Sequence, residues 1–138
     1  FANGGNAIPY SNLELYLMGL IGPDELEAVQ VAVNPEQGSS FGQFTADAID
    51  TYTAQEMIAR NGARMPNHIN SQKEFRALTV IISKEELNEE RMEVTHAYLD
   101  NFSRPAAPDD SWGTLHNFWL ATEGRASFKF DVLPEHIK

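Results

Sequence analysis

Hydrophobic residues between positions 10 and 20 do not form a single stripe around a helix. Ser11 and Glu14 have the Ser-x-x-Glu spacing of a capping box, in which each side chain binds a backbone N–H that the first helical turn leaves unpaired. Beyond the cap, the apolar residues lie on every side of a 3.6-residue wheel: Leu13, Leu15, Tyr16, Leu17, Met18 and Leu20. The pattern predicts a helix that begins at Ser11, is buried all round and is stopped by Gly19 and Gly22-Pro23.

Residues 29–33 and 127–133 alternate apolar and polar residues with the period of two that is typical of strands. Residues 44–52 are a third strand candidate. The intervening residues 34–43 contain proline, glycine and two serines, which predicts a mobile loop, and residues 63–72 read as a second loop.

The densest β-branched run of the chain is Leu78-Thr79-Val80-Ile81-Ile82 within residues 75–83. Branched side chains favour the pleated backbone, and an unbroken apolar run is typical of a strand that is covered on both faces. We therefore expect this segment to be a central, buried strand.

Two further capping boxes predict two further helices. Thr53 and Glu56 open one that runs toward Gly62, and Ser83 and Glu86 open one that extends to about Phe102. A last helix is expected over residues 112–122, closed by glycine at position 124. Helices mixed irregularly with strands indicate an α+β fold, with a small mixed or antiparallel sheet packed against three to four helices.

The length of 138 residues suits a single domain over residues 1–138. Because the chain opens on Phe1 without an initiator methionine or a signal peptide, we expect it to be a fragment or C-terminal subdomain of a longer protein. The missing part would then help to cover the first helix.

The acidic balance narrows the possible partners. A formal net charge of −10 repels phosphate backbones and anionic membrane surfaces, so neither nucleic acid nor a membrane is expected as a partner. The chain has no cysteine, which excludes a disulfide framework and a thiolate nucleophile.

Candidate metal ligands are scattered. The four histidines are far apart in the sequence and include no His-Glu-x-x-His pair: His68, His96, His116 and His136. Glu93 and His96 have the Glu-x-x-His spacing of half a di-iron site, but such a site needs a second copy and further carboxylates. The neighbouring pairs His96 with Asp100 and Asp109 with Asp110 are read as solvated side chains or caps.

Two features near the C-terminal end invite a binding interpretation and a structural one. Trp112, Phe118 and Trp119 could form a binding platform, but aromatic residues at helical spacing are more often part of a core. Arg125 follows Gly124, where its guanidinium could cap the last carbonyls of a helix or hold a buried carboxylate. We predict that Arg125 is a structural anchor.

Two stretches near the ends of the chain have a characteristic sequence. Residues 10–20 read Tyr-Ser-Asn-Leu-Glu-Leu-Tyr-Leu-Met-Gly-Leu and are followed by Gly22-Pro23-Asp24-Glu25. Residues 118–127 read Phe-Trp-Leu-Ala-Thr-Glu-Gly-Arg-Ala-Ser. The first stretch resembles one that follows the His-Glu-x-x-His helix in secreted bacterial zinc metallopeptidases of the metzincin-like type, and the second resembles the closing segment of the same proteins.

The resemblance implies that this chain lies downstream of the zinc helix, and that Met18 supports the metal site as a Met-turn. The zinc ligands and the general-base glutamate are not in this sequence, so the resemblance implies no catalytic, cofactor-binding or metal-binding residue here. Zinc would belong to the parent protein. The implied partners are the rest of the parent polypeptide and a peptide or protein substrate, in an extracellular or periplasmic location.

Two other interpretations stay open. The chain could be a non-catalytic extracellular structural or protein-interaction module, or a self-contained hydrolase, which no motif supports. A His-Glu-x-x-His sequence upstream of Phe1 would favour the peptidase, and its absence would favour the module.

Overall fold

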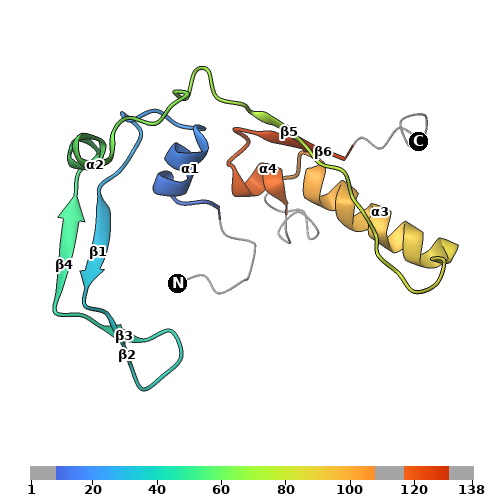
Figure 1. The fold of residues 1–138 in the computed structure, drawn as a ribbon, viewed down its shortest axis with the longest axis horizontal. Helices are drawn as coiled ribbons and strands as arrows, with labels where there is room; N and C mark the ends of the chain where they lie inside the picture. Colours follow the sequence, from blue (N-terminus) through green and yellow to red (C-terminus); the bar gives the residue numbers. More distant parts are fainter. Residues whose placement is uncertain (1–8, 108–116, 131–138) are drawn as a thin grey trace. The chain divides into compact units, whose positions relative to one another are not determined.

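The computed structural model describes residues 9–107 and 117–130 (Figure 1). The chain divides into two compact units. Unit 1 contains Ser11–Ser71, and unit 2 contains Gln72–Lys138 together with Ala2–Tyr10. The expectation of a single domain stays a prediction.

Helix α1 of unit 1 (Asn12–Met18) begins where the sequence predicts. The Ser11 and Glu14 side chains form both hydrogen bonds of the capping box. Gly19 ends the helix in the left-handed conformation, with φ of 77°, and its N–H donates to the carbonyls of Leu15 and Tyr16. The predicted start and end of this helix are confirmed.

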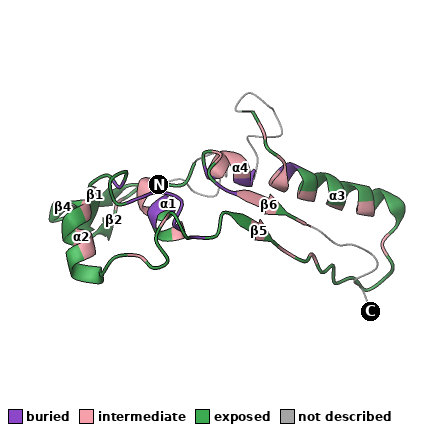
Figure 2. Cartoon of the chain, turned by 90° about the horizontal axis from the view of Figure 1, so that it is seen from above, coloured by how far each residue is buried: buried purple, intermediate pink, exposed green. Residues whose placement is uncertain are grey.

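The prediction that α1 is buried all round is wrong. Leu15 and Tyr16 are its buried residues, but the side chain of Leu17 is 61% exposed. A helix of seven residues packs one side against its own unit, and Leu17 points away from that side. The small apolar core of unit 1 consists of Leu15, Tyr16, Leu20, Ile21 and Leu26 (Figure 2).

Besides α1, unit 1 contains two short antiparallel sheets and a second helix. Strand β1 (Val29–Val33) pairs with β4 (Ala48–Tyr52), and β2 (Glu36–Gln37) pairs with β3 (Phe44–Thr45). Helix α2 (Ala54–Asn61) starts from the predicted capping box of Thr53 and Glu56 and is followed by Gly62.

The strand expected over residues 44–52 is divided, and part of the expected loop 34–43 is a strand. Asn34 has a positive φ of 49°, which turns the backbone out of the β1–β4 ladder. The side-chain amide of Asn34 donates to the Asp47 carboxylate at 2.9 Å. This turn separates the two sheets.

Unit 2 contains one parallel pair of strands and two helices. Strand β5 (Glu74–Arg76) pairs in parallel with β6 (Ser127–Lys129), and helices α3 (Glu89–Ser103) and α4 (Phe118–Ala121) pack with β6. Aromatic rings lie 5.0–6.5 Å apart in a cluster that forms its centre: Phe75, Phe102, Phe118, Phe128 and Phe130. Thr122 is fully buried beside this cluster and donates from its hydroxyl to the Phe118 carbonyl at 2.8 Å.

The run at 78–82 is not a buried central strand, so that prediction is wrong. Residues 77–83 form neither helix nor strand, and Leu78, Val80 and Ile82 are 69%, 72% and 95% exposed. A strand needs a hydrogen-bonded neighbour whatever its side chains prefer. No described residue supplies one.

The helix expected from residue 84 starts later. The Ser83 hydroxyl accepts from the N–H of Glu85 and donates to the Glu85 carbonyl, so it caps no helix. Asn88 caps α3 instead, because its side-chain oxygen Oδ1 accepts from the backbone N–H of Arg91 at 3.0 Å. Of the last helix and strand, α4 and β6 are described, whereas Trp112, Asp109, Asp110, His116, His136 and residues 131–133 lie outside the described residues.

Small sheets combined with helices make this an α+β fold, as predicted from the sequence. Among the described residues there are four helices, and two of the three strand pairs are antiparallel. None of the helices in the described part of the chain has both the length and the apolar character needed to cross a bilayer.

Candidate functional site

The residue of interest in unit 1 is Met18, the last residue of α1. Arg64, in the loop after α2, donates from Nε to the Leu17 carbonyl at 2.9 Å and from Nη2 to the Met18 carbonyl at 3.1 Å. Its Nη1 also contacts the carbonyl of Pro66. We call Arg64, Ser71 and the carbonyls of Leu17, Met18 and Gly19 that they bind the Arg64 clasp.

Gly19 is the third part of the clasp. The Ser71 hydroxyl donates to its carbonyl, so the carbonyls of three successive residues are bound by the same loop. A Cβ atom at position 19 would lie 2.5 Å from Cζ of Arg64 and 2.7 Å from Cβ of Ser71. The clasp therefore requires glycine here, both for space and for the φ of 77°.

The clasp solves a problem that every helix end has. The last carbonyls of a helix have no intrahelical partner and carry the negative end of the helix dipole. The Arg64 guanidinium is a fixed cation with planar donors, so it satisfies these carbonyls and complements their charge. The backbone N–H of Arg64 also donates to the Tyr16 hydroxyl at 3.2 Å. The backbone before and after Met18 is consequently held in place, because Arg64 binds the carbonyls of Leu17 and Met18 and Ser71 binds that of Gly19.

Met18 thus lies at the junction of a helix and a tight turn. The capping box predicts a helix at this point and the resemblance implies a turn, and the structure has a helix that ends at Met18 and a turn at Gly19. The Met18 side chain is half-buried. Its assignment as a support for a metal site stays a prediction.

The described residues do not fit a zinc ion. No three or more of their histidine, aspartate and glutamate side chains are grouped so that they could hold a metal. His68 and Asp24 both approach Gly22, but two groups do not complete the four-coordinate site that zinc prefers. His96 is exposed on α3, one turn after Glu93.

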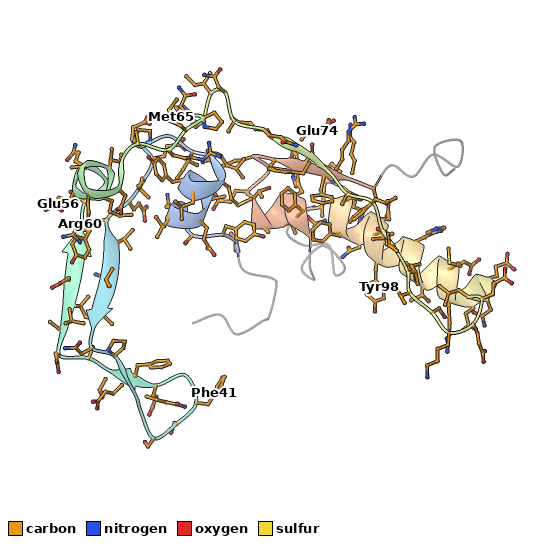
Figure 3. All side chains as sticks on the ribbon, in the orientation of Figure 1. Phe41, Glu56, Arg60, Met65, Glu74 and Tyr98 are labelled. Carbon is orange, nitrogen blue, oxygen red and sulfur yellow. The ribbon has the colours of Figure 1, made fainter. Side chains whose placement is uncertain are left out.

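A cleft of about 510 Å³ in unit 2 brings His96 and Asp100 together with Ser103 and Lys129, over a floor that includes Phe128. Two of its polar groups, those of Ser103 and Lys129, are engaged by neighbours. The Ser103 hydroxyl donates to the Leu99 carbonyl. The Lys129 ammonium binds the carboxylate of Glu74, which Figure 3 labels, at 2.9 Å. This bond with Lys129, and a second one with Arg76, lower the pKa of Glu74 from its ordinary value. No hydrogen bond within the described ranges joins His96 to Ser103, so the cleft does not present an activated nucleophile.

Comparison of the chain with protein-family models, with curated proteins and with solved structures finds no match.

The predicted anchor Arg125 lies in the turn after α4. Its guanidinium is 3.7 Å from the Glu123 carboxylate, and both side chains are partly exposed. The backbone N–H of Arg125 donates to the Thr122 carbonyl at 3.0 Å. The anchor role of Arg125 stays a prediction.

The aromatic stripe contributes to the core rather than to an open platform where it is described. Phe118 is 8% exposed, and Trp119 is half-buried, with its indole against Gly124.

The sequence interpretation missed Arg64. Arg64 is 46 residues from Met18, and nothing in its own neighbourhood marks it as a helix cap. A carbonyl-binding arginine has no local spacing rule, unlike the capping box at the other end of the same helix. One sequence signal for Arg64 is its position in a loop between Gly62 and Pro66, because glycine and proline restrict the path of the chain there.

Proposed function

We propose that this chain is the C-terminal, non-metal-ligating subdomain of a secreted zinc metallopeptidase, and that the Arg64 clasp fixes Met18 as a support under the metal site of the parent protein. The zinc ligands, the general base and the remaining polypeptide would lie upstream of Phe1. The substrate would be a peptide or protein outside the cell or in the periplasm. This chain alone would perform no chemistry.

The observation that carries the proposal is the restraint on Met18. Its carbonyl is bound by Arg64, and the next residue is a glycine that the clasp cannot exchange for another residue. A supporting side chain must hold one position to within a fraction of an ångström, which requires a rigid backbone beneath it. The resemblance of residues 10–20 and 118–127 to zinc metallopeptidases supplies the chemical context.

The role of this chain's residues would be positioning. When bound in the parent protein, zinc would polarise a peptide carbonyl and activate water. Met18 would pack beneath the ligands, and Arg64 and Ser71 would keep the helix end from shifting. Unit 2 would complete the core or the substrate cleft.

The first test is the reading frame upstream of Phe1, where a His-Glu-x-x-His sequence is expected. In the polypeptide that contains both parts, Met18→Ala should lower zinc content and peptidase activity. The matched control is Leu17→Ala, since Leu17 is 61% exposed on the same helix and its carbonyl is bound by the same arginine. Loss of activity that is equal in both variants would contradict a specific role of Met18.

The chain alone offers a second test. Metal analysis of the purified protein should find no stoichiometric zinc. Zinc bound through His68, His96 or His116 would contradict the proposal, and loss of that zinc in histidine-to-alanine variants would identify the ligands.

A second candidate function is a non-catalytic extracellular interaction module. Residues 36–52 of unit 1 favour it, because Phe41, which Figure 3 labels, Phe44 and Ile49 are 82%, 54% and 58% exposed. Large exposed apolar side chains are a feature of interaction surfaces. An upstream sequence without a zinc motif would favour this function over the first.

A further inference from the structure

The exposed run Leu78–Ile82 in unit 2 has side chains that favour a strand, but it forms no strand and has no partner among the described residues. We call residues 78–82 the open strand. None of its backbone N–H or carbonyl groups forms a hydrogen bond with another part of the described chain. Unpaired backbone groups beside exposed Leu78, Val80 and Ile82 are the features of a sheet edge that accepts another strand.

The two faces of the open strand differ. Thr79 and Ile81 line a cleft that Met92 of α3 also lines, so the odd-numbered side chains face their own unit. Leu78, Val80 and Ile82 alternate with them and form an apolar row on the opposite face. An added strand would extend this row and shield it from water.

The pairing of β5 with β6 tells which edge is open. The Lys73 carbonyl accepts from Ser127, and the Ala77 N–H donates to Lys129, so odd-numbered residues direct their backbone groups toward β6. Backbone groups alternate in direction along a strand. In a continuation of the extended backbone of β5, the even-numbered residues 78, 80 and 82 direct theirs to the opposite edge, away from β6.

We propose that the open strand pairs with the same segment of a second copy of this chain, in antiparallel orientation. The charges on its two flanks favour this partner. Lys73, Glu74 and Arg76 precede the run, with two cations to one anion, and Lys84, Glu85 and Glu86 follow it, with one cation to two anions. Antiparallel pairing places the basic flank of each copy beside the acidic flank of the other, whereas parallel pairing would place the acidic flanks together.

The register follows from the same charges. Pairing with Ile81 opposite its own copy places Val80 opposite Ile82. It places Arg76 opposite Glu86 when the bend at residues 84–85 straightens into the added ladder. A shift that centres the pairing on Val80 would place Arg76 opposite Lys84, which is repulsive. The net charge of −10 opposes contact between copies in general, so the local match of opposite charges selects this edge.

Sedimentation velocity of the whole chain over a range of concentrations tests the proposal. An interface of one short strand is small, so we expect a concentration-dependent dimer rather than a permanent one. Val80→Lys places a charge in the apolar row and should give a monomer. The matched control is Ile69→Lys in unit 1, where Ile69 is 73% exposed, and this variant should dimerise like the wild type.

A charge exchange tests the register. Arg76→Glu alone and Glu86→Arg alone should each raise the dissociation constant by roughly threefold to thirtyfold, and the double variant should restore it. Circular dichroism of each variant checks that the units stay folded. Hydrogen exchange at Val80 and Ile82 should slow as the protein concentration rises.

Three results would overturn the proposal. They are a monomer at every concentration, equal loss of the dimer in the Val80→Lys and Ile69→Lys variants, or a double charge variant that stays as weak as the single ones. The inference does not depend on the metallopeptidase proposal, because every test uses this chain alone and measures no activity.

Discussion

Arg64 and Met18 are joined by a hydrogen bond of 3.1 Å from the guanidinium Nη2 to the carbonyl oxygen, across 46 positions of the sequence. The bond connects the loop that follows α2 to the last turn of α1. The end of the helix and the path of the loop therefore depend on each other, so a substitution in either should alter the stability of both.

Arg64→Ala should lower the free energy of unfolding of unit 1 by about 1–3 kcal/mol, because it removes donors that carry charge to several carbonyls. Arg64→Lys should recover only part of this loss, since an ammonium cannot reproduce the planar donor geometry. Urea unfolding measures both values. The control is Arg60→Ala: Arg60 lies 5.1 Å from the centre of the Tyr52 ring at an exposed site, so a loss of less than about 1 kcal/mol is expected. Similar losses for Arg60 and Arg64 would argue against the clasp.

Gly19→Ala should destabilise unit 1 by more than the backbone conformation alone explains. Both Gly19 and Gly42 have positive φ, 77° and 78°, but a Cβ at position 42 would meet nothing within 4 Å. Gly42→Ala should therefore cost only the left-handed backbone energy, about 1–2 kcal/mol. Gly19→Ala adds the displacement of Arg64 and Ser71. If thermal unfolding shows the two variants to be equal, the space around Gly19 is not restricted.

Helix α2 should lose stability in acid through Glu56. The backbone N–H and hydroxyl of Thr53 both donate to this carboxylate and hold the pKa of Glu56 below its ordinary value. A lowered pKa in the folded state stabilises the protein above the ordinary pKa, and the gain disappears as the pH falls through the lowered one. Glu56→Gln should remove this pH dependence, whereas Glu36→Gln, outside any capping box, should retain it. Helicity followed between neutral and acidic pH gives the comparison.

Phe118→Ala should strongly destabilise unit 2. Phe118 is 8% exposed and contacts the rings of Phe75, Phe102 and Phe128, so its removal leaves a cavity and should cost about 3–5 kcal/mol. Phe41→Ala removes an equal side chain that is 82% exposed, and unfolding should change by less than about 0.5 kcal/mol. Comparable losses at the two positions would mean that the aromatic cluster is not the core of unit 2.

Local sequence rules located the features that depend on local hydrogen bonds. The boxes of Ser11 with Glu14 and Thr53 with Glu56 are confirmed, as are the ends at Gly19 and Gly62. In each case a side chain binds backbone within three or four positions, so spacing alone determines the structure. The strand at 29–33 is also confirmed, since its alternation matches its pairing with β4.

Features that depend on distant partners were missed. The run at 78–82 has the strongest strand preference of the chain, yet preference does not supply a neighbouring strand. The capping box at Ser83 failed because the hydroxyl binds the nearer Glu85, and Asn88 then competes successfully for the start of α3. The position of Arg64 depends on the path of a whole loop, which no pattern of residues encodes.

The parallel pairing of β5 with β6 has a consequence for the time course of folding. Glu74 and Lys129, which form an ion pair beside this ladder, are 55 positions apart. Parallel strands cannot be joined by a tight hairpin, and closure of a long loop must precede their hydrogen bonds. During synthesis, α3 can form as soon as it leaves the ribosome, but the aromatic cluster must wait for Phe128. Unit 2 should therefore fold late and cooperatively, and a ribosome stalled before residue 127 should leave Phe75, Phe102 and Phe118 accessible to chaperones.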